Sequence, residues 1–365
     1  MMELKALKSD LIVATQITQN IISNQSSLPI LSNLLFEAKK DVVRVITTDL
    51  DIGISYSFKA DVIEEGAITI PAKKFSDIIK ELPEEEVEIL VRKNNIIEVR
   101  SANSYFKLMG IAKEEFPKLP TFTNKEFISM NQGRLKKMLE MSFFAVSRDE
   151  TRYVLNGILI ELKEKYIKTI ATDGRRLALI ETQGDFPQKI DKKIIIPSKT
   201  AQELMRNLGQ EGDVRIVFSE NQACFEFGKI ILTSRLIEGE FPEYNKVIPK
   251  EIKLKIRLNK NKFLKAIKRV ALFTNPDSIV IKLDIMKNKI ILNKSTPDLG
   301  EARDEVDIKY EGKELSIGFN PNYLMDILKA VNLEEIDIEI TDPQKPAVIR
   351  RDGEFIFIVL PMQLI

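Results

Sequence analysis

The side chains best able to do chemistry in this chain are carboxylates, because the sequence contains no histidine and only one cysteine. Without histidine, the Ser-His and Cys-His nucleophile systems are excluded, and so is the commonest general base. A single cysteine excludes thiolate zinc sites and iron–sulfur clusters. The sequence also has no glycine-rich phosphate loop of the Walker or dinucleotide type. The residues therefore predict no cofactor and leave carboxylate chemistry as the open catalytic route.

One pair of carboxylates is close enough in sequence to suggest a metal site. Asp49 and Asp51 are separated by one residue. A polar loop that flanks a strand has the same composition, and we favour that interpretation and predict no metal. The single cysteine, Cys224, alternates with Ala223 and Phe225 in a strand-like pattern, which indicates a buried structural thiol.

The Thr-Asp pair that contains Asp49 recurs along the chain. Its threonines are Thr48, Thr172 and a degenerate copy at Thr296, so both steps are 124 residues. Two further markers keep nearly the same spacing, namely Pro71, Pro197 and Pro321, and the Phe-Pro pairs at 116–117 and 241–242. Self-similarity at a fixed period indicates one architectural unit used repeatedly. The sequence therefore predicts three similar domains, at 1–121, 122–249 and 250–365, a design that suits a molecule that curves or encloses.

Length and composition agree with this organisation. A chain of 365 residues suits two or three domains, and its 44% of hydrophobic residues allows each copy its own core. No run approaches the roughly 20 apolar residues of a membrane span. The N-terminus lacks the basic and apolar regions of a signal peptide. With one unpaired cysteine, these features predict a cytoplasmic protein that makes no membrane contact.

Apolar patterning predicts an α+β fold with short strands and two helices per repeat. Segments rich in Ile, Val and Phe predict strands at 43–46, 87–91, 96–100, 158–162, 214–218, 230–233, 279–283, 289–292, 336–340 and 355–360. Helical spacing and the repeated prolines predict helices at 5–23, 73–81, 133–147, 199–207, 259–270 and 321–330.

Charge is unevenly divided between these helices and the remaining chain. The six helical segments hold 16 Lys and Arg against 6 Asp and Glu, whereas the whole chain has a net charge of only +1. The segment 259–270 has five basic residues and no acidic one. Lysine-rich solvated faces are common on single helices, but a bias of this size over the six segments together indicates a basic helix face. Such a face attracts a phosphate backbone without reading base sequence.

Five motifs resemble one known family when they are taken in order. They are Leu28-Pro29-Ile30-Leu31-Ser32-Asn33-Leu34, Arg152-Tyr153-Val154-Leu155-Asn156-Gly157, Ala171-Thr172-Asp173-Gly174-Arg175-Arg176-Leu177-Ala178, Glu240-Phe241-Pro242-Glu243-Tyr244 and Val359-Leu360-Pro361-Met362-Gln363-Leu364. Together with the triplication, they resemble the bacterial sliding clamps, the β subunits of the replicative DNA polymerase III. The resemblance covers the whole chain.

The resemblance implies the DNA clamp fold and a processivity factor without catalytic activity. Each of three similar domains would pack two helices on antiparallel sheets, and the crescent-shaped chain would dimerise into a closed ring around duplex DNA. Helices would line the hole. A clamp loader would open the ring with its own ATP, and a short peptide motif would tether the DNA polymerase III α subunit, other DNA polymerases and repair proteins.

The resemblance also assigns residues to three sites. The partner-peptide pocket would use Leu155, Thr172, Gly174, Arg175, Arg176, Leu177, Pro242, Val247, Val359, Leu360, Pro361, Met362 and Leu364. DNA contacts would come from Asn24, Gln25, Lys73, Arg148, Asp149, Arg152, Tyr153, Val154 and Lys199, with Lys262, Lys265 and Lys268 on the basic helix. The dimer interface would use Phe106, Leu108, Leu272, Phe273, Glu301 and Glu305.

Some of these residues differ from the family pattern. Arg175 stands where histidine is common, Gln25 replaces a usual arginine, and Asp149 is acidic. Two other readings of the chain stay open from the residues alone: a triplicated hydrolase that uses carboxylates, and a DNA-binding scaffold that never closes into a ring.

Overall fold

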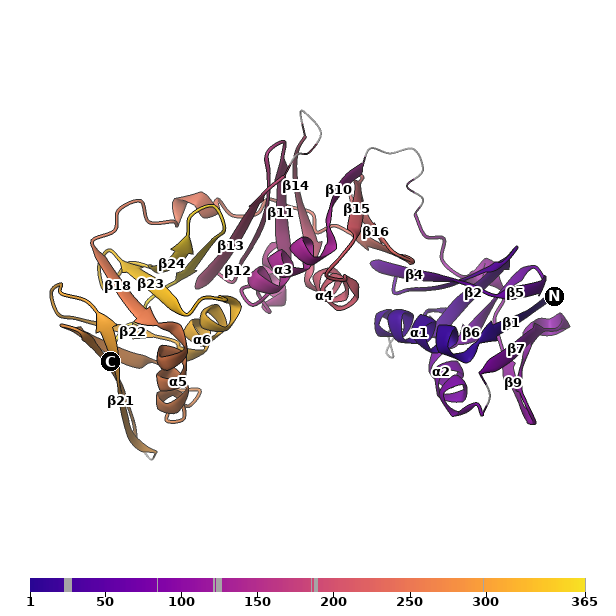
Figure 1. Ribbon diagram of the computed structural model, residues 1–365, viewed down its shortest axis with the longest axis horizontal. Helices are drawn as coiled ribbons and strands as arrows, with labels where there is room; N and C mark the ends of the chain where they lie inside the picture. The colour runs from indigo at the N-terminus through magenta and orange to yellow at the C-terminus, as the bar shows by residue number, and fades with distance from the viewer. Residues whose placement is uncertain are drawn as a thin grey trace. The chain divides into compact units, whose positions relative to one another are not determined.

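The protein is described by a computed structural model that covers residues 1–22, 28–83, 85–120, 122, 127–184, 186, 190–297 and 299–364 (Figure 1). Its chain divides into two compact units. The first unit contains residues 1–134 and 202–236, and the second contains 135–201 and 237–365. The middle third of the sequence therefore contributes to both units.

The first unit contains two antiparallel sheets and two helices. Its five-stranded sheet has the order β5-β1-β7-β8-β9, and its eight-stranded sheet has the order β10-β15-β16-β17-β4-β3-β2-β6. The strands are β1 (Met2–Leu7), β2 (Asn33–Lys39), β3 (Val42–Thr48), β4 (Ile52–Lys59), β5 (Asp61–Glu64), β6 (Gly66–Pro71), β7 (Glu86–Val91), β8 (Ile96–Ser101), β9 (Ser104–Met109), β10 (Phe127–Asn131), β15 (Asp213–Phe218), β16 (Gln222–Phe227) and β17 (Ile230–Arg235). The helices are α1 (Lys8–Thr18) and α2 (Ala72–Glu81), which contact each other.

The second unit contains one sheet of twelve strands, in the order β14-β11-β12-β13-β25-β24-β23-β18-β21-β20-β19-β22. The strands are β11 (Gly157–Lys163), β12 (Tyr166–Thr172), β13 (Arg176–Gln183), β14 (Asp191–Pro197), β18 (Leu254–Asn259), β19 (Ile281–Met286), β20 (Lys289–Thr296), β21 (Gly300–Lys309), β22 (Leu315–Phe319), β23 (Glu335–Ile340), β24 (Ala347–Arg351) and β25 (Phe355–Val359). Helices α5 (Lys260–Ala271) and α6 (Pro321–Ala330) contact each other, and α3 (Gln132–Phe143) and α4 (Ser198–Asn207) contain points where the chain passes between units.

Strand pairing joins neighbouring repeats within each unit. In the first unit β4 of the first repeat pairs with β17 of the second, with Gly53 opposite Thr233. In the second unit β13 of the second repeat pairs with β25 of the third, with Leu177 opposite Ile358. We call these the first joint and the second joint. Backbone hydrogen bonds therefore make the sheet continuous across each joint.

The α+β class agrees with the structure, but strands such as β2, β4 and β13 were not among those predicted, the helix predicted at 133–147 ends at Phe143, and the N-terminus differs. A helix was expected from residue 5, but Met2–Leu7 form β1, which pairs with β5 and β7, and α1 begins at Lys8. In β1, buried Met2, Leu4 and Ala6 alternate with more exposed residues, which is the period-2 pattern of a strand. The helical prediction failed because an apolar run on either side of residue 8 fits both periods.

The repeated Thr-Asp pair builds the same turn at both joints. At the first joint the Thr48 hydroxyl donates to the carbonyl of Ile52, and the Asp49 carboxylate accepts from the Ile52 N–H. At the second joint Thr172 donates to the carbonyl of Arg176, and Asp173 accepts from the Arg176 N–H. Each turn also contains a residue with positive φ, 82° at Leu50 and 84° at Gly174. The Thr-Asp pair therefore closes the turn from which the strand at each joint begins.

Candidate functional site: an apolar pocket at the second joint

A pocket of about 160 Å³ opens beside the turn of the second joint. It is lined by Leu155, Thr172, Gly174, Arg175, Arg176, Leu177, Pro242, Glu243, Tyr244, Val247, Ile358 and Leu360. Four parts of the chain therefore meet here: Leu155, the β12–β13 turn, the segment after Phe241, and the end of β25. An apolar cleft with a few polar groups at its margin is the usual form of a binding site for a small ligand or a short peptide.

Local structure explains how these segments come together. The carbonyl of Arg175 accepts a hydrogen bond of 2.9 Å from the N–H of Leu360, which fixes the end of β25 against the turn. Leu155 ends the 3-10 helix η5 (Glu150–Leu155), and Tyr244 begins η6 (Tyr244–Lys246). Each segment ends in a backbone hydrogen bond, from the Asn156 N–H to the Tyr153 carbonyl and from the Val247 N–H to the Tyr244 carbonyl.

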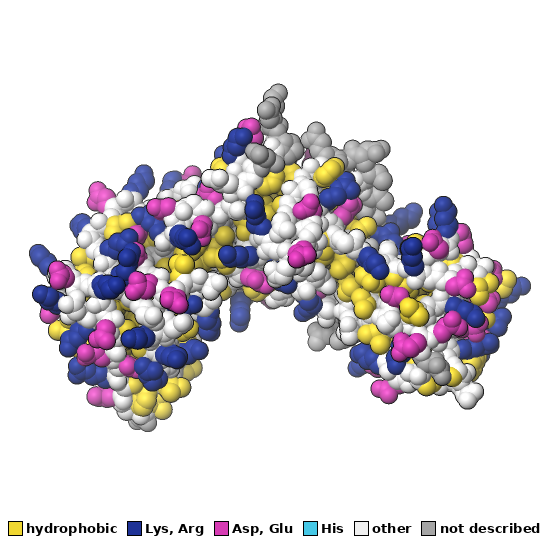
Figure 2. Space-filling model, viewed as in Figure 1, with side chains coloured by type: hydrophobic (Ala, Val, Ile, Leu, Met, Phe, Trp, Pro, Cys, Tyr) yellow, Lys and Arg dark blue, Asp and Glu magenta, His cyan; other side chains and the backbone are white. Residues whose placement is uncertain are grey.

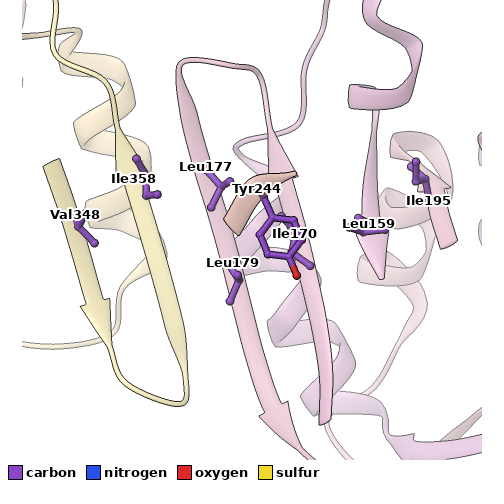
Figure 3. Close-up of a cluster of buried hydrophobic side chains, with 8 residues drawn as sticks. All are labelled: Leu159, Ile170, Leu177, Leu179, Ile195, Tyr244, Val348 and Ile358. Atoms are coloured by element: carbon purple, nitrogen blue, oxygen red, sulfur yellow. The ribbon is translucent and has the colours of Figure 1, made fainter. Parts of the chain in front are cut away.

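A cluster of buried apolar side chains forms the floor of the pocket. Its members are Leu159, Ile170, Leu177, Leu179, Ile195, Tyr244, Val348 and Ile358 (Figure 3). They come from strands β11 to β14, β24 and β25 and from η6, so both repeats at the joint contribute to one core. Leu177, Tyr244 and Ile358 belong to both the cluster and the pocket lining.

A buried carboxylate holds the tyrosine of this floor. The Tyr244 hydroxyl donates to Glu161 Oε2 at 3.0 Å, and the Tyr166 hydroxyl donates to Glu161 Oε1 at 3.2 Å. Lys193 Nζ lies 3.4 Å from Glu161 Oε2. Burial by itself raises the pKa of Glu161, but the Tyr244 hydrogen bond and the Lys193 charge lower it overall. Burial and the adjacent Glu161 charge raise the pKa of Tyr244, so at neutral pH the pair is a phenol that donates to a carboxylate.

Nine of the predicted pocket residues line the pocket, from Leu155 through Val247 to Leu360. The structure places the other four elsewhere among the described residues. Val359 is only 1% exposed, because it pairs with Arg176 on one side and Ala347 on the other. Met362 donates its N–H to the carbonyl of Gly318, and the C-terminal segment follows β22 in that region. Pro361 and Leu364 belong to this segment, and a peptide contact for it stays a prediction.

Three lining residues were missed by sequence reasoning: Glu243, Tyr244 and Ile358. Glu243 and Tyr244 directly follow Pro242, which was assigned, and their backbone follows the pocket margin. Ile358 pairs with Leu177 across the joint. Only knowledge of the strand register could have identified it, because residue 358 is far from residue 177 in sequence.

Comparison with known proteins identifies the family. The chain matches the N-terminal, central and C-terminal domains of the DNA polymerase III beta subunit at residues 2–120, 129–243 and 245–363. It is 33% identical to the beta sliding clamp of Chlamydia pneumoniae over 95% of this chain and 94% of the relative. The chain belongs to the DNA polymerase III beta subunit family, the bacterial sliding clamps. Its function is that of a processivity factor in DNA replication.

Solved structures of sliding clamps share the fold over the whole chain. The DNA polymerase sliding clamp of Bacillus subtilis aligns with a TM-score of 0.97 and 30% identity, and covers 100% of both chains. A sliding clamp of Pseudomonas aeruginosa, solved bound to griselimycin, aligns with a TM-score of 0.94 and 28% identity over 100% of both chains. The three-domain α+β clamp fold expected from the sequence is therefore confirmed.

Four of the six residues that the resemblance to sliding clamps assigns to the dimer interface lie on incompletely paired strands. Phe106 and Leu108 belong to β9, the last strand of the five-stranded sheet. In the second unit, β21 pairs with β20 from residue 300 to 307, whereas its pairing with β18 is limited to Ile308 and Lys309 among the described residues. Glu301 and Glu305 are on this half-open strand and are exposed. Leu272, at the end of α5, is 78% exposed, while Phe273 is half-buried.

The residues assigned to DNA contacts are mostly exposed. Lys73, Arg148, Arg152 and Tyr153 are exposed, Val154 and Lys199 are half-buried, and Asn24 and Gln25 lie outside the described residues. Lys262, Lys265 and Lys268 are exposed on α5, whose opposite face buries Phe263, Ala266, Ile267 and Val270. Figure 2 shows basic and acidic side chains interspersed over the face in view.

Asp149 serves a local structural purpose. Its carboxylate caps η5 by accepting hydrogen bonds from the hydroxyl and the N–H of Thr151, and these bonds lower its pKa. Arg152 Nε lies 3.7 Å from the same carboxylate. The acidic residue that departs from the family pattern therefore orders the segment that leads into Leu155.

Asp49 lies in a hydrogen-bonded turn, and Cys224 is buried in strand β16. Asp49 Oδ1 accepts the backbone N–H groups of Asp51 and Ile52, and the described residues contain no cluster of three acidic or thiol side chains that could bind a metal. Cys224 is 1% exposed, and burial raises the pKa of its thiol to about 12. No described helix is long and apolar enough to cross a membrane.

Proposed function

We propose that this clamp works as a closed homodimeric ring around duplex DNA and that the pocket at the second joint binds short peptide segments of its partners. The proposal keeps three domains, at 1–121, 122–249 and 250–365, as the repeated units of the ring. The observation that carries it is the pocket itself, an apolar cleft on a backbone held by hydrogen bonds from both repeats.

Ring closure is supported by the state of two strand edges. An exposed edge strand invites pairing with another chain and is a liability when it stays open. β9 and residues 300–307 of β21 each present such an edge, and Tyr105 and Met109 on β9 are more than half exposed. Pairing β9 of one protomer with β21 of its partner would satisfy both edges twice in a two-fold ring.

DNA would be held by enclosure and by a weak attraction to basic helices. The exposed lysines of α5 lie three residues apart on one face, and no acidic residue interrupts that helix. A phosphate backbone would be attracted to them without base contacts. Changing Lys262, Lys265 and Lys268 to glutamate should therefore weaken DNA retention increasingly as salt is lowered, while leaving thermal unfolding unchanged, because all three side chains are exposed.

The pocket would tether the DNA polymerase III α subunit, the clamp loader, and other polymerases and repair proteins in turn. Its lining offers two apolar walls, Leu177 with Ile358 and Pro242 with Val247, and polar groups at Thr172 and Arg175. A peptide with a glutamine followed by a spaced leucine and phenylalanine has matching chemistry, and we call it the probe peptide. Burying two large apolar side chains would contribute on the order of 3–6 kcal/mol before ordering costs, so micromolar affinity is the expected scale.

Retention on circular DNA tests the ring. The chain should be loaded with its clamp loader on a nicked circle and then separated from free protein. Linearising the circle should release the protein, because a ring slides off a free end. Retention after linearisation would indicate ordinary binding and contradict enclosure.

A Leu272→Ala, Phe273→Ala variant should sediment as a monomer and fail to be retained on the intact circle. Such a ring would act on the chromosome, in the cytoplasm.

A further inference from the structure

One of the two arginines that line the pocket, Arg176, is already paired with carboxylates. The Arg176 side chain is only 12% exposed although its residue lines the cleft. Its Nε donates to Asp173 Oδ2 at 3.0 Å, and its Nη1 donates to Asp326 Oδ2 at 2.7 Å. These two bonds tie the nearly buried guanidinium to two carboxylates, so its charge is already compensated within the protein. Arg176 therefore contributes to the pocket through the groups that it holds in place.

Two aromatic rings complete the enclosure of this guanidinium. The Arg176 Cζ atom lies 4.5 Å from the ring centre of Tyr323 on α6 and 5.4 Å from that of Phe144, just after α3. Phe144 in turn contacts Phe357 of β25 edge to face, at 5.5 Å. Arg176 is thus enclosed by groups from the second and third repeats, and cation–π contacts of this kind strengthen when the cation is desolvated.

We propose that Asp326, which does not line the pocket, is a positioning residue for it. Asp326 holds Arg176, and Arg176 is the first residue of β13, where its backbone pairs with Val359 and its carbonyl accepts from Thr172. The next residue, Leu177, is an apolar wall of the pocket. Through Arg176, a carboxylate on α6 thereby fixes the place of the pocket wall. This inference rests on the proposed peptide-binding function.

Asp326 also connects the pocket to a second hollow in the same unit. It lines a cavity of about 420 Å³ together with Lys137, Glu140, Met141, Phe144, Lys329, Ala330 and Asn332. Helices α3 and α6 provide most of this lining. Loss of the Asp326 carboxylate on the helix side can therefore reach the peptide pocket through one ion pair, although Asp326 and Arg176 are 150 residues apart in sequence.

The internal repeat provides a comparison without this link. Counting back 124 residues places Ile52 at the position of Arg176 and Gln202 at the position of Asp326. Ile52 is buried at the first joint and carries no charge to be held. The repeated fold therefore does not need the ion pair, which supports a function specific to the second joint.

Removing the Asp326 carboxylate should weaken peptide binding while the chain remains folded. We expect Asp326→Ala to weaken binding of the probe peptide to the full-length chain about 5- to 20-fold, since hydrogen bonds between charged groups are among the stronger ones. Asp326→Glu should recover at least half of the lost affinity. Lys329→Ala is the matched control, because Lys329 lies on the same helix and 3.9 Å from Asp326 without contacting Arg176. Its affinity should stay within about twofold of wild type.

Two further readouts separate positioning from general damage. In wild type an Arg176 Nη1–H should give a slowly exchanging NMR signal, which should be lost in Asp326→Ala, whereas the signal of the Nε–H, which donates to Asp173, should remain. In an Arg176→Ala background, Asp326→Ala should cause no further loss of affinity, because the two residues act as one unit. Equal affinity of wild type and Asp326→Ala, with thermal unfolding showing both folded, would overturn the inference. Failure of wild type itself to bind the probe peptide would instead refute the proposed function.

Discussion

The two joints share a backbone and differ in their side chains. At both, a threonine hydroxyl and an aspartate carboxylate close the turn, and an N–H from the next repeat donates to the carbonyl within that turn. The N–H of Arg235 donates to Asp51 at 2.7 Å at the first joint, and that of Leu360 donates to Arg175 at 2.9 Å at the second. Each joint also has a cavity, of about 190 Å³ and 160 Å³ respectively.

The side chains around the cavity of the second joint are more apolar than those around the cavity of the first. Where the second joint has Leu177 and Ile358 facing each other, the first has Gly53 and Thr233. Where the second has Leu360, the first has Arg235, which pairs with Asp51 at 3.9 Å. The comparison teaches that this fold supplies a cavity at every joint, whereas the substituents decide whether it can bury apolar side chains of a partner.

Truncating the apolar wall should give the largest effect. Leu177 is 3% exposed and packs in the core cluster, so Leu177→Ala should lower the free energy of unfolding by about 2–4 kcal/mol. Binding of the probe peptide should be lost at the same time. Urea unfolding and fluorescence anisotropy would measure the two effects. A variant that is destabilised but binds normally would show that Leu177 supports only the core.

Giving the first joint a leucine should strain it without creating a binding site. A Cβ at Gly53 would lie 2.7 Å from Leu119 Cδ2 and 2.8 Å from Thr233 Oγ1, so Gly53→Leu should destabilise the first unit by about 1–3 kcal/mol. Peptide affinity should not change, because the second joint is untouched. Calorimetry with and without the probe peptide would test both statements, and altered affinity would contradict the independence of the two joints.

Giving the second joint the arginine of the first should weaken binding with little loss of stability. Leu360 is 39% exposed, so Leu360→Arg should change the free energy of unfolding by less than about 0.5 kcal/mol. We expect probe-peptide affinity to fall about tenfold, because an apolar contact is replaced by a charge that keeps its water. Leu299→Arg, at another exposed leucine outside the pocket, is the control. Unchanged affinity in Leu360→Arg would remove this residue from the site.

Removing the hydroxyl under the pocket should have the smallest effect. Tyr244→Phe leaves Glu161 without its 3.0 Å donor, and we expect a loss of about 1 kcal/mol in stability and a few-fold loss in affinity. The folded-state pKa of Glu161 is lowered, so its contribution is present above the unfolded pKa and lost as pH falls through the folded value. Wild type should therefore exceed the variant in stability at pH 7 and lose that advantage in acid, as measured by urea unfolding across pH. A constant difference would exclude Glu161 as the cause.

Much of this comparison could be read from the sequence, because the Thr-Asp turn depends on local residues. The spacing of Thr48 and Thr172 predicted a repeated unit, and the two threonine hydroxyls form equivalent hydrogen bonds. Helices were predicted well where a proline marks the start, as at Pro321, and poorly at residues 5–7, where strand and helix periods compete. The residues that pair across a joint could not be predicted, because the pairing of Leu177 with Ile358 depends on the strand register between distant segments.

The Arg176–Asp326 pair illustrates the same limit. Both residues are ordinary charged residues in sequence, and nothing in their spacing indicates a contact between a strand end and a helix face. The resemblance assigned Arg176 to the partner-peptide pocket without indicating what holds it. Its guanidinium is enclosed by two carboxylates and two aromatic rings, an arrangement that only the tertiary structure brings together.

A crystal structure of the full-length chain with the probe peptide tests the central claim most directly. We expect the peptide at the second joint only, with its leucine and phenylalanine against Leu177 and Val247, and with the cavity beside Gly53 and Arg235 free of peptide. Peptide bound at the first joint, or at both joints alike, would contradict the account, because the side chains that distinguish the two cavities would then not determine binding.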